Sequence, residues 1–342
     1  MSSTTSHYAN RLRQELTVRN RAYARGRAHV ESYGSTPVVV YEPEESRHGN
    51  FFDAAYAAIA ERPDWLRRFE KVHAQAARSL PRPKLDARRR WRELDSSMSS
   101  DALLMNVFCT PGVAESAAVR GLLGVDERAE PEFGWKARVP LAGERTRADR
   151  TEVDMRLGSL LVEAKLTETD FQSRSAAAVE AYRDFDEVFE AERLPRAEIA
   201  VSRWLRTSEF PENASQERES EVADPGLFAA IDARFRPRGE EGYAGYQLIR
   251  NVLAARATDS SFCVLHDARR PDLREAWFAV MAAVKDAALR VRLKTLTWQE
   301  LAAALPDALK EFLDVKYGIV PPGKTAAAVE DPEAGQAASP AP

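Results

Sequence analysis

The stretch Glu152-Val-Asp154-Met-Arg-Leu-Gly-Ser-Leu-Leu-Val-Glu163-Ala-Lys165 decides the fold that this sequence predicts. Apolar and charged residues alternate over 152–157, which is typical of a strand with one buried face. The strand expected over 160–166 is apolar on both faces except at Glu163 and Lys165, as in the centre of a sheet. Gly158-Ser159 fits a two-residue hairpin turn, and this turn places Asp154 opposite Glu163 and Glu152 opposite Lys165.

Two carboxylates that face each other on paired strands lie within roughly 5 Å and repel. A hard cation between them removes the repulsion, and Mg²⁺ prefers carboxylate oxygens and keeps several waters. The pattern therefore predicts a Mg²⁺ site at Asp154 and Glu163, in which Mn²⁺ can substitute. Lys165 emerges on the same face, where it can hold a water or stabilise a reacting phosphate. The alternative is a solvated face with cross-strand ion pairs, which the apolar second strand disfavours.

Asp154 followed by Glu163-Ala-Lys165 resembles the Asp-(x)n-(Glu/Asp)-x-Lys motif of the PD-(D/E)xK nuclease superfamily, with Val153 in place of the proline. Other short pieces follow in an order that resembles a bacterial group of PGN_0703-like restriction endonucleases, over residues of about 90–320. These pieces are Ser96-Ser97, Asn106-Val-Phe108, Glu132-Phe133, Lys165-Leu-Thr-Glu168, Gln247-Leu-Ile-Arg250 and Lys316-Tyr-Gly-Ile319.

The resemblance implies a Mg²⁺-dependent endonuclease that hydrolyses DNA and serves restriction or defence. Asp154 and Glu163 would bind the metal, and Lys165 would position or activate the attacking water. Glu132 would be an additional acid at the metal, with Glu115 as a competing candidate. Members of the superfamily often dimerise to cut both strands, so a homodimer is one assembly to expect.

The resemblance also implies that Gln247 and Arg250 approach the site from one face of a helix beside the sheet. There they would steady a water and a phosphate, because Arg binds phosphate oxygens bidentately. The alternative for both residues is an ordinary exposed helix face. A different class of function also stays open, in which the chain keeps the nuclease fold as a catalytically inactive module that binds nucleic acid or protein. A weaker reading is an enzyme that acts on RNA or on branched DNA in repair.

The composition limits the classes of protein to which this chain can belong. The 342 residues are 44% hydrophobic and 30% charged, as in a soluble globular protein, and no run approaches a membrane span. The N-terminus lacks an apolar signal core, so we expect a cytoplasmic protein. Cys109 and Cys263 are too few for a disulfide framework or a zinc site. Neither a phosphate-binding glycine loop nor a Gly-x-Ser-x-Gly elbow occurs. His266-Asp267 suggests acid–base catalysis, but a structural role is the stronger interpretation.

The net charge is −4, but the basic residues gather near the N-terminus. Residues 1–92 carry 18 Lys and Arg against 10 Asp and Glu, so the remainder is acidic. The basic part could supply phosphate contacts to DNA. The predicted DNA-binding residues form the densest basic run: Lys84, Arg88, Arg89, Arg90 and Arg92. Trp91 in this run could stack on a base or pack into the protein.

The expected fold class is α/β, with a restriction-endonuclease-like core of a mixed central sheet flanked by helices. We predict three parts: a mostly helical basic region over 1–94, the nuclease-like core over 95–320, and a disordered tail over 321–342. Within the core, a helix over 99–108 precedes strands at 133–141, 151–157 and 160–166. A charged crossover helix over 171–193 then leads to a strand over 196–205.

Overall fold

The computed structural model of the protein describes residues 2–34, 36–73, 79–126, 128–143, 147–150, 152–199 and 240–328. The predicted disordered tail, 321–342, lies outside the described residues from 329 onward. Among the described helices, none combines the length and the apolar composition needed to cross a bilayer.

A five-stranded mixed sheet forms the centre of the molecule, in the order β12-β11-β7-β6-β3. The strands β12, β11 and β7 run parallel, whereas β7, β6 and β3 run antiparallel. Every residue of β7 is buried, which explains why this strand is apolar on both faces. The predicted fold class is therefore confirmed. The strands are β3 (Pro131–Lys136), β6 (Glu152–Leu157), β7 (Leu160–Ala164), β11 (Ser261–His266) and β12 (Leu293–Thr297).

The hairpin between β6 and β7 has the predicted turn and register. Leu157 pairs with Leu160 and Met155 pairs with Val162 across the turn at Gly158-Ser159. Gly158 has a φ of 58°, a left-handed conformation that glycine adopts without steric cost. The named pairing ends at Met155, so the two strands separate where Asp154 and Glu163 would be the next pair.

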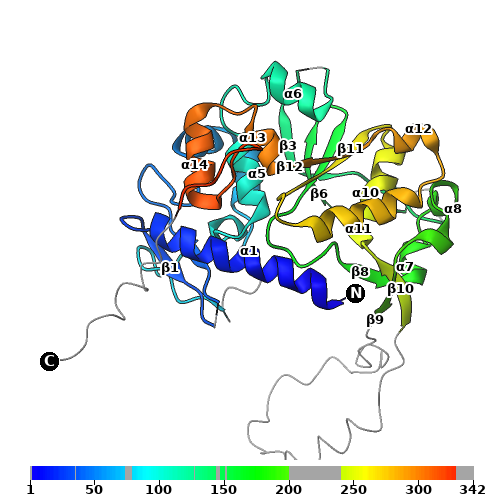
Figure 1. Ribbon diagram of the computed structural model, residues 1–342, viewed down its shortest axis with the longest axis horizontal. Coiled ribbons are helices and arrows are strands. Elements are labelled where there is room, and N and C mark those ends of the chain that lie inside the picture. The colour runs from blue at the N-terminus through cyan, green and yellow to red at the C-terminus, as the bar shows by residue number, and fades with distance from the viewer. Residues whose placement is uncertain are drawn as a thin grey trace, which may run out of the picture.

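Helices cover both faces of this sheet (Figure 1). The helices α10 (Tyr246–Ala257) and α11 (Pro271–Ala282) cover one face, and the helices α5 (Ser100–Phe108), α13 (Trp298–Ala302) and α14 (Asp307–Tyr317) cover the other. Ser99 caps α5, because its side chain accepts a hydrogen bond of 3.2 Å from the Ala102 backbone N–H.

The predicted helix over 171–193 is wrong. The segment forms β8 (Ser173–Ser175), α7 (Ala176–Val179), α8 (Phe185–Val188) and the 3-10 turn η2 (Ala191–Arg193). Tertiary hydrogen bonds to a distant segment interrupt the helix, since the Ala142 N–H donates to the Ala181 carbonyl at 2.7 Å. The crossover to β11 passes through α10 instead. The strand β10 (Glu240–Ala244) joins β8 and β9 (Arg196–Ile199) in a second sheet, and the predicted strand beyond 199 lies outside the described residues.

The N-terminal region packs directly on the core. Leu12 and Leu16 of α1 (Ser2–Tyr23) belong to the same apolar cluster as α5 and α14, and α3 (Pro63–Phe69) lies against β3, with the Trp65 Nε1–H donating to the Pro131 carbonyl at 3.0 Å. This region thereby borders the face of the sheet that carries the predicted site. The remaining elements are β1 (His29–Glu31), β2 (Val39–Tyr41), α2 (Asp53–Glu61), η1 (Glu93–Asp95), α6 (Ala117–Leu123), β4 (Val139–Pro140), β5 (Ala148–Asp149) and α12 (Ala287–Arg290).

Candidate active site

Asp154, Glu163 and Lys165 converge at the end of the hairpin. The Lys165 Nζ lies 2.8 Å from Glu163 Oε1, and both side chains are deeply buried, with exposures of 5% and 1%. Asp154 reaches the same place from β6, because its Oδ2 accepts a hydrogen bond of 2.8 Å from the backbone N–H of Ala164. Buried charges of this kind are costly and are kept only where partners or a ligand compensate.

Asp154 is buried near other acids, and both conditions affect its pKa. Burial raises the pKa of Asp154 well above its ordinary value, and the charges of Glu163 and Asp101 raise it further. Lys165 and the Ala164 N–H act in the opposite direction but do not cancel the effect. Acidic side chains therefore gather at this site, and a divalent cation would stabilise their ionised forms.

Lys165 keeps its proton at neutral pH. Burial alone would lower the pKa of Lys165, but the carboxylates of Glu163, Glu168 and Asp154 outweigh burial and raise it. Glu168 is itself held by the Ser100 hydroxyl and by the Leu166 backbone N–H. A charged ammonium group at this place can orient a water or stabilise a phosphate.

The helix α10 reaches the site through a residue that the sequence interpretation missed. The Asn251 Nδ2–H donates to Glu163 Oε2 at 2.8 Å, so a protein donor holds each oxygen of Glu163. Gln247, which was expected here, lies half-buried in the first turn of the same helix. Asn251 is four residues after Gln247, and counting one full turn along the helix would have found it.

Arg250 is buried, with an exposure of 3%, which excludes the alternative of an exposed helix face for this residue. Its Nη2 donates to the Glu152 carbonyl at 2.9 Å and to Asn251 Oδ1 at 2.8 Å. Its Nε and Nη1 are buried and have no hydrogen-bond partner within the described part of the chain. Buried donors without a partner are rare and indicate an additional ligand, such as a water or a substrate oxygen.

Asp101 and Arg68 are further residues that the sequence interpretation missed. Asp101 lies in the first turn of α5, and Arg68 of α3 contacts it at 2.5 Å and Glu152 at 2.8 Å. Burial raises the pKa of Asp101, and Arg68 opposes the rise. The signal for Asp101 was its position, two residues after the Ser99 cap of the first helix of the core.

The structure does not bring the other two predicted acids to this pair. Glu132 is exposed on β3 opposite Arg156, with which it forms an ion pair of 3.5 Å. Glu115, the competing candidate, is exposed in the turn before α6. Within the ranges that the structure describes, no three His, Cys, Asp or Glu side chains gather as a metal-binding group. Asp154 and Glu163 are therefore the two acids that the geometry offers to a cation.

The basic run 84–92 is only partly available to a ligand. Lys84, Arg88 and Arg90 are exposed. In contrast, Arg89 pairs with the buried Asp95 at 2.7 Å, and Arg92 lies 3.6 Å from Glu70. The Trp91 side chain is 4% exposed and its Nε1–H donates to the Pro81 carbonyl at 2.7 Å. Trp91 is thus packed into the protein, and the stacking role considered for it is wrong.

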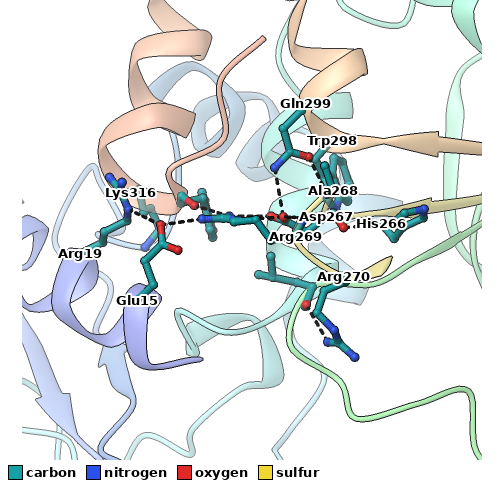
Figure 2. Close-up of polar contacts among 12 residues, drawn as sticks. Glu15, Arg19, His266, Asp267, Ala268, Arg269, Arg270, Trp298, Gln299 and Lys316 are labelled. Carbon is teal, nitrogen blue, oxygen red and sulfur yellow. Dashed lines mark hydrogen bonds and ion pairs between the residues drawn. The ribbon is translucent and has the colours of Figure 1, made fainter. Parts of the chain in front are cut away.

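The Asp267 carboxylate belongs to a structural network at the end of β11 (Figure 2). It accepts hydrogen bonds from Arg269 Nη2 at 2.6 Å and from Gln299 Nε2 at 3.1 Å, and Arg269 also contacts Glu15 of α1 at 2.7 Å. The ring of His266 instead bonds to the backbone carbonyl of Asp267 at 3.0 Å. The pair ties β11 to α13 and α1, which agrees with the structural interpretation.

Comparison with known families matches the model of restriction endonucleases associating with ARP (REase-ARP) to residues 17–318. The chain belongs to this family. The REase-ARP match includes the β6–β7 hairpin, the helix α10 and most of the N-terminal region, so it supports the resemblance to restriction endonucleases over nearly the whole chain. No curated protein and no solved structure is similar enough to count as a match.

Proposed function

We propose that the protein is a metal-dependent endonuclease of the PD-(D/E)xK type, which hydrolyses DNA phosphodiester bonds in restriction or defence. The observation that carries the proposal is the convergence of Asp154 and Glu163 beside the buried ammonium group of Lys165. Membership in a family of restriction endonucleases supports the same chemistry.

The residues present fit a magnesium ion. The donors are carboxylate oxygens, which Mg²⁺ prefers, and two of them suffice because this ion keeps several waters. Burial, together with the charges of Glu163 and Asp101, raises the pKa of Asp154, and a bound ion would stabilise its ionised form. Mg²⁺, or Mn²⁺ in its place, would supply a Lewis acid and an activated water.

The side chains of the protein would then act as follows. Asp154 and Glu163 would hold the ion, and Asn251 would keep the Glu163 carboxylate in orientation. Lys165 would stabilise charge on the phosphate or hold the water, because it stays protonated. The unpartnered Nε and Nη1 of Arg250 would donate to a phosphate oxygen after a small shift.

The test is cleavage of supercoiled plasmid DNA by the purified protein. Nicking should require Mg²⁺ or Mn²⁺, stop with a chelator, and fall at least 100-fold in Lys165→Ala. Lys294→Ala, which removes a half-buried lysine that donates to backbone carbonyls at the end of α6, is the matched control and should cleave normally. Equal nicking by the wild type and Lys165→Ala would reveal a contaminating nuclease and overturn the proposal.

A second candidate is a catalytically inactive module of the same fold that binds nucleic acid or protein. Both oxygens of the Glu163 carboxylate already accept hydrogen bonds from protein donors, Lys165 and Asn251, which favours this candidate. Calorimetric titration with Mn²⁺ separates the two. A binding isotherm that Asp154→Asn weakens supports the nuclease, whereas a flat titration of the wild type supports the binding module.

A further inference from the structure

A groove of about 770 Å³ runs between α3 and β3, on the side of the molecule where Arg68 lies. One wall carries Arg67 in the last turn of α3 and Lys71, two residues beyond the end of this helix. The other side carries Lys136, Arg138 and Arg150. The floor is the segment 133–135 of β3.

The groove is electropositive although the whole chain is acidic. Its lining includes six basic and four acidic side chains. Each acid is already paired, in three cases with an arginine from outside the lining: the pairs are Asp64 with Arg62, Glu70 with Arg92, Glu132 with Arg156, and Glu152 with Arg68 and Lys136. In contrast, Arg67, Arg138 and Arg150 form no ion pair with any described residue. Unpaired cations that line a hollow attract anions.

Arg68 joins this groove to the candidate active site. It lines the groove, and it contacts both Glu152 and Asp101, whose charge acts on Asp154. Its Nε is buried without a hydrogen-bond partner in the described structure. The floor leaves room for this side chain at Gly134, because a Cβ there would lie 3.2 Å from Arg68 Nη1. A chain of phosphates in the groove would therefore lead to the acids of the site.

We propose that the groove between α3 and β3 binds the sugar-phosphate backbone of a DNA duplex and directs it to Asp154 and Glu163. The inference rests on the proposed function, since it names the surface by which the substrate reaches that site. It assigns the main phosphate contacts to Arg67, Arg138 and Arg150 and not to the basic run 84–92. That run borders a second hollow, which shares Glu70 with the groove.

The cations of the groove are more available to a ligand than its aromatic rings. The Arg156 guanidinium lies over the Trp135 ring, 4.7 Å from its centroid, and the Trp65 ring is buried with Arg62 over it at 4.1 Å. The third ring, Phe133, is half-buried and packs edge-on against Trp65, so we expect phosphate contacts to outweigh base stacking here. Binding through the groove should depend strongly on salt and little on DNA sequence.

The experiment measures fluorescence anisotropy of a labelled 25-base-pair duplex with the full-length protein in the presence of a chelator, so that no cleavage occurs. The test variant is Arg67→Glu/Arg138→Glu. The control is Arg183→Glu/Arg290→Glu, which makes the same charge change at two exposed arginines. Arg183 lies between α7 and α8, and Arg290 lies on α12. The groove variant should bind at least tenfold more weakly, with the slope of log K against log salt reduced by about 1.8, while the control binds within twofold of wild type.

Each outcome has a distinct meaning. If the groove variant binds DNA with wild-type affinity, the proposal that the groove binds DNA is overturned, whereas the proposed nuclease activity is not affected. A wild type that does not bind the duplex at all, in a sample that still nicks plasmid, also overturns it. A clear preference for an RNA duplex of the same sequence overturns the assignment to DNA. Arg67→Gln/Arg138→Gln, which removes charge without reversing it, should give an intermediate loss, and unchanged thermal unfolding of all variants shows that the loss is not misfolding.

Discussion

The Asp154 carboxylate accepts a 2.8 Å hydrogen bond from the backbone N–H of Ala164, the residue between Glu163 and Lys165. This bond joins Asp154 within β6 to the last residue of β7, just beyond the point where the ladder between the two strands ends. It fixes Asp154 beside Glu163, so the two acids stay close without a cation between them. The site is thus preorganised, at a cost in stability that the ion would recover.

Asp154→Asn should stabilise the metal-free protein. Because burial and Glu163 raise the pKa of Asp154, removing its charge relieves an unfavourable interaction of about 1 kcal/mol. The amide oxygen can still accept from the Ala164 N–H. In a chelator, the Tm of Asp154→Asn should exceed that of wild type by about 2 °C. With excess Mn²⁺, wild type should gain stability and the variant should not; a lower Tm for the variant in chelator would contradict this account.

Asp101 should matter more for cleavage than Glu132. Asp101 is close enough to act on Asp154 and anchors Arg68, whereas Glu132 is exposed and pairs with Arg156. We expect Asp101→Asn to lower the rate of plasmid nicking at least tenfold, equivalent to about 1.4 kcal/mol, and Glu132→Gln to change it less than twofold. Initial rates at saturating DNA provide the comparison. A larger loss of nicking rate in Glu132→Gln than in Asp101→Asn would indicate that Glu132 acts at the metal site.

Asn251 should position Glu163. Asn251→Ala leaves Glu163 Oε2 and one Arg250 donor without their partner, so it should destabilise the protein by about 1–3 kcal/mol. The matched control is Asn106→Ala, which removes an equally buried asparagine that bonds to three backbone groups of the core. Both variants should lose stability in urea unfolding, but only Asn251→Ala should bind Mn²⁺ more weakly. Equal Mn²⁺ affinity in the two variants would assign Asn251 a purely structural role.

Stability should fall as the pH drops from 7 to 5, with His48 contributing. The His48 ring accepts from the Asn50 N–H at Nδ1 and donates to Asp95 from Nε2, so it is buried in the neutral form. Burial lowers the pKa of His48. Below pH 6.5 the unfolded chain therefore binds a proton that the folded protein does not bind, and this difference destabilises the fold.

His48→Gln can still donate to Asp95 but cannot take up a proton. Between pH 7 and 5, the loss of unfolding free energy should be smaller in His48→Gln than in wild type by about 1 kcal/mol. Urea unfolding at both pH values measures this difference. His29→Gln, at a half-buried histidine that bonds to the Arg27 carbonyl, is the control and should keep the wild-type slope. An identical slope in His48→Gln would show that other groups cause the acid sensitivity.

Local patterns in the sequence predicted the centre of the fold well. The alternation before Gly158 and the apolar run after it were enough to predict the β6–β7 turn and register, because one face of β6 must be buried. The same approach failed over 171–193. A helical spacing of apolar residues does occur there, with Val179, Tyr182, Phe185 and Val188 all buried, but backbone bonds to the segment around Pro140 override it.

The candidate site could be predicted only in part, for a related reason. Asp154, Glu163 and Lys165 are close in sequence, so a hairpin register brings them together. The partners of these residues come from distant segments: Asn251 from α10, Asp101 from α5 and Arg68 from α3. Their contacts depend on how the helices pack, and neither periodicity nor charge counting contains that information.

The Arg68 side chain of the N-terminal region contacts Asp101 of α5 and Glu152 of β6. A fragment that begins near residue 95 would lack the arginine that pairs with Asp101 and one entire wall of the groove. The candidate active site and the proposed DNA groove therefore both depend on the N-terminal region. Any engineered version of this protein has to keep the N-terminal region together with the core.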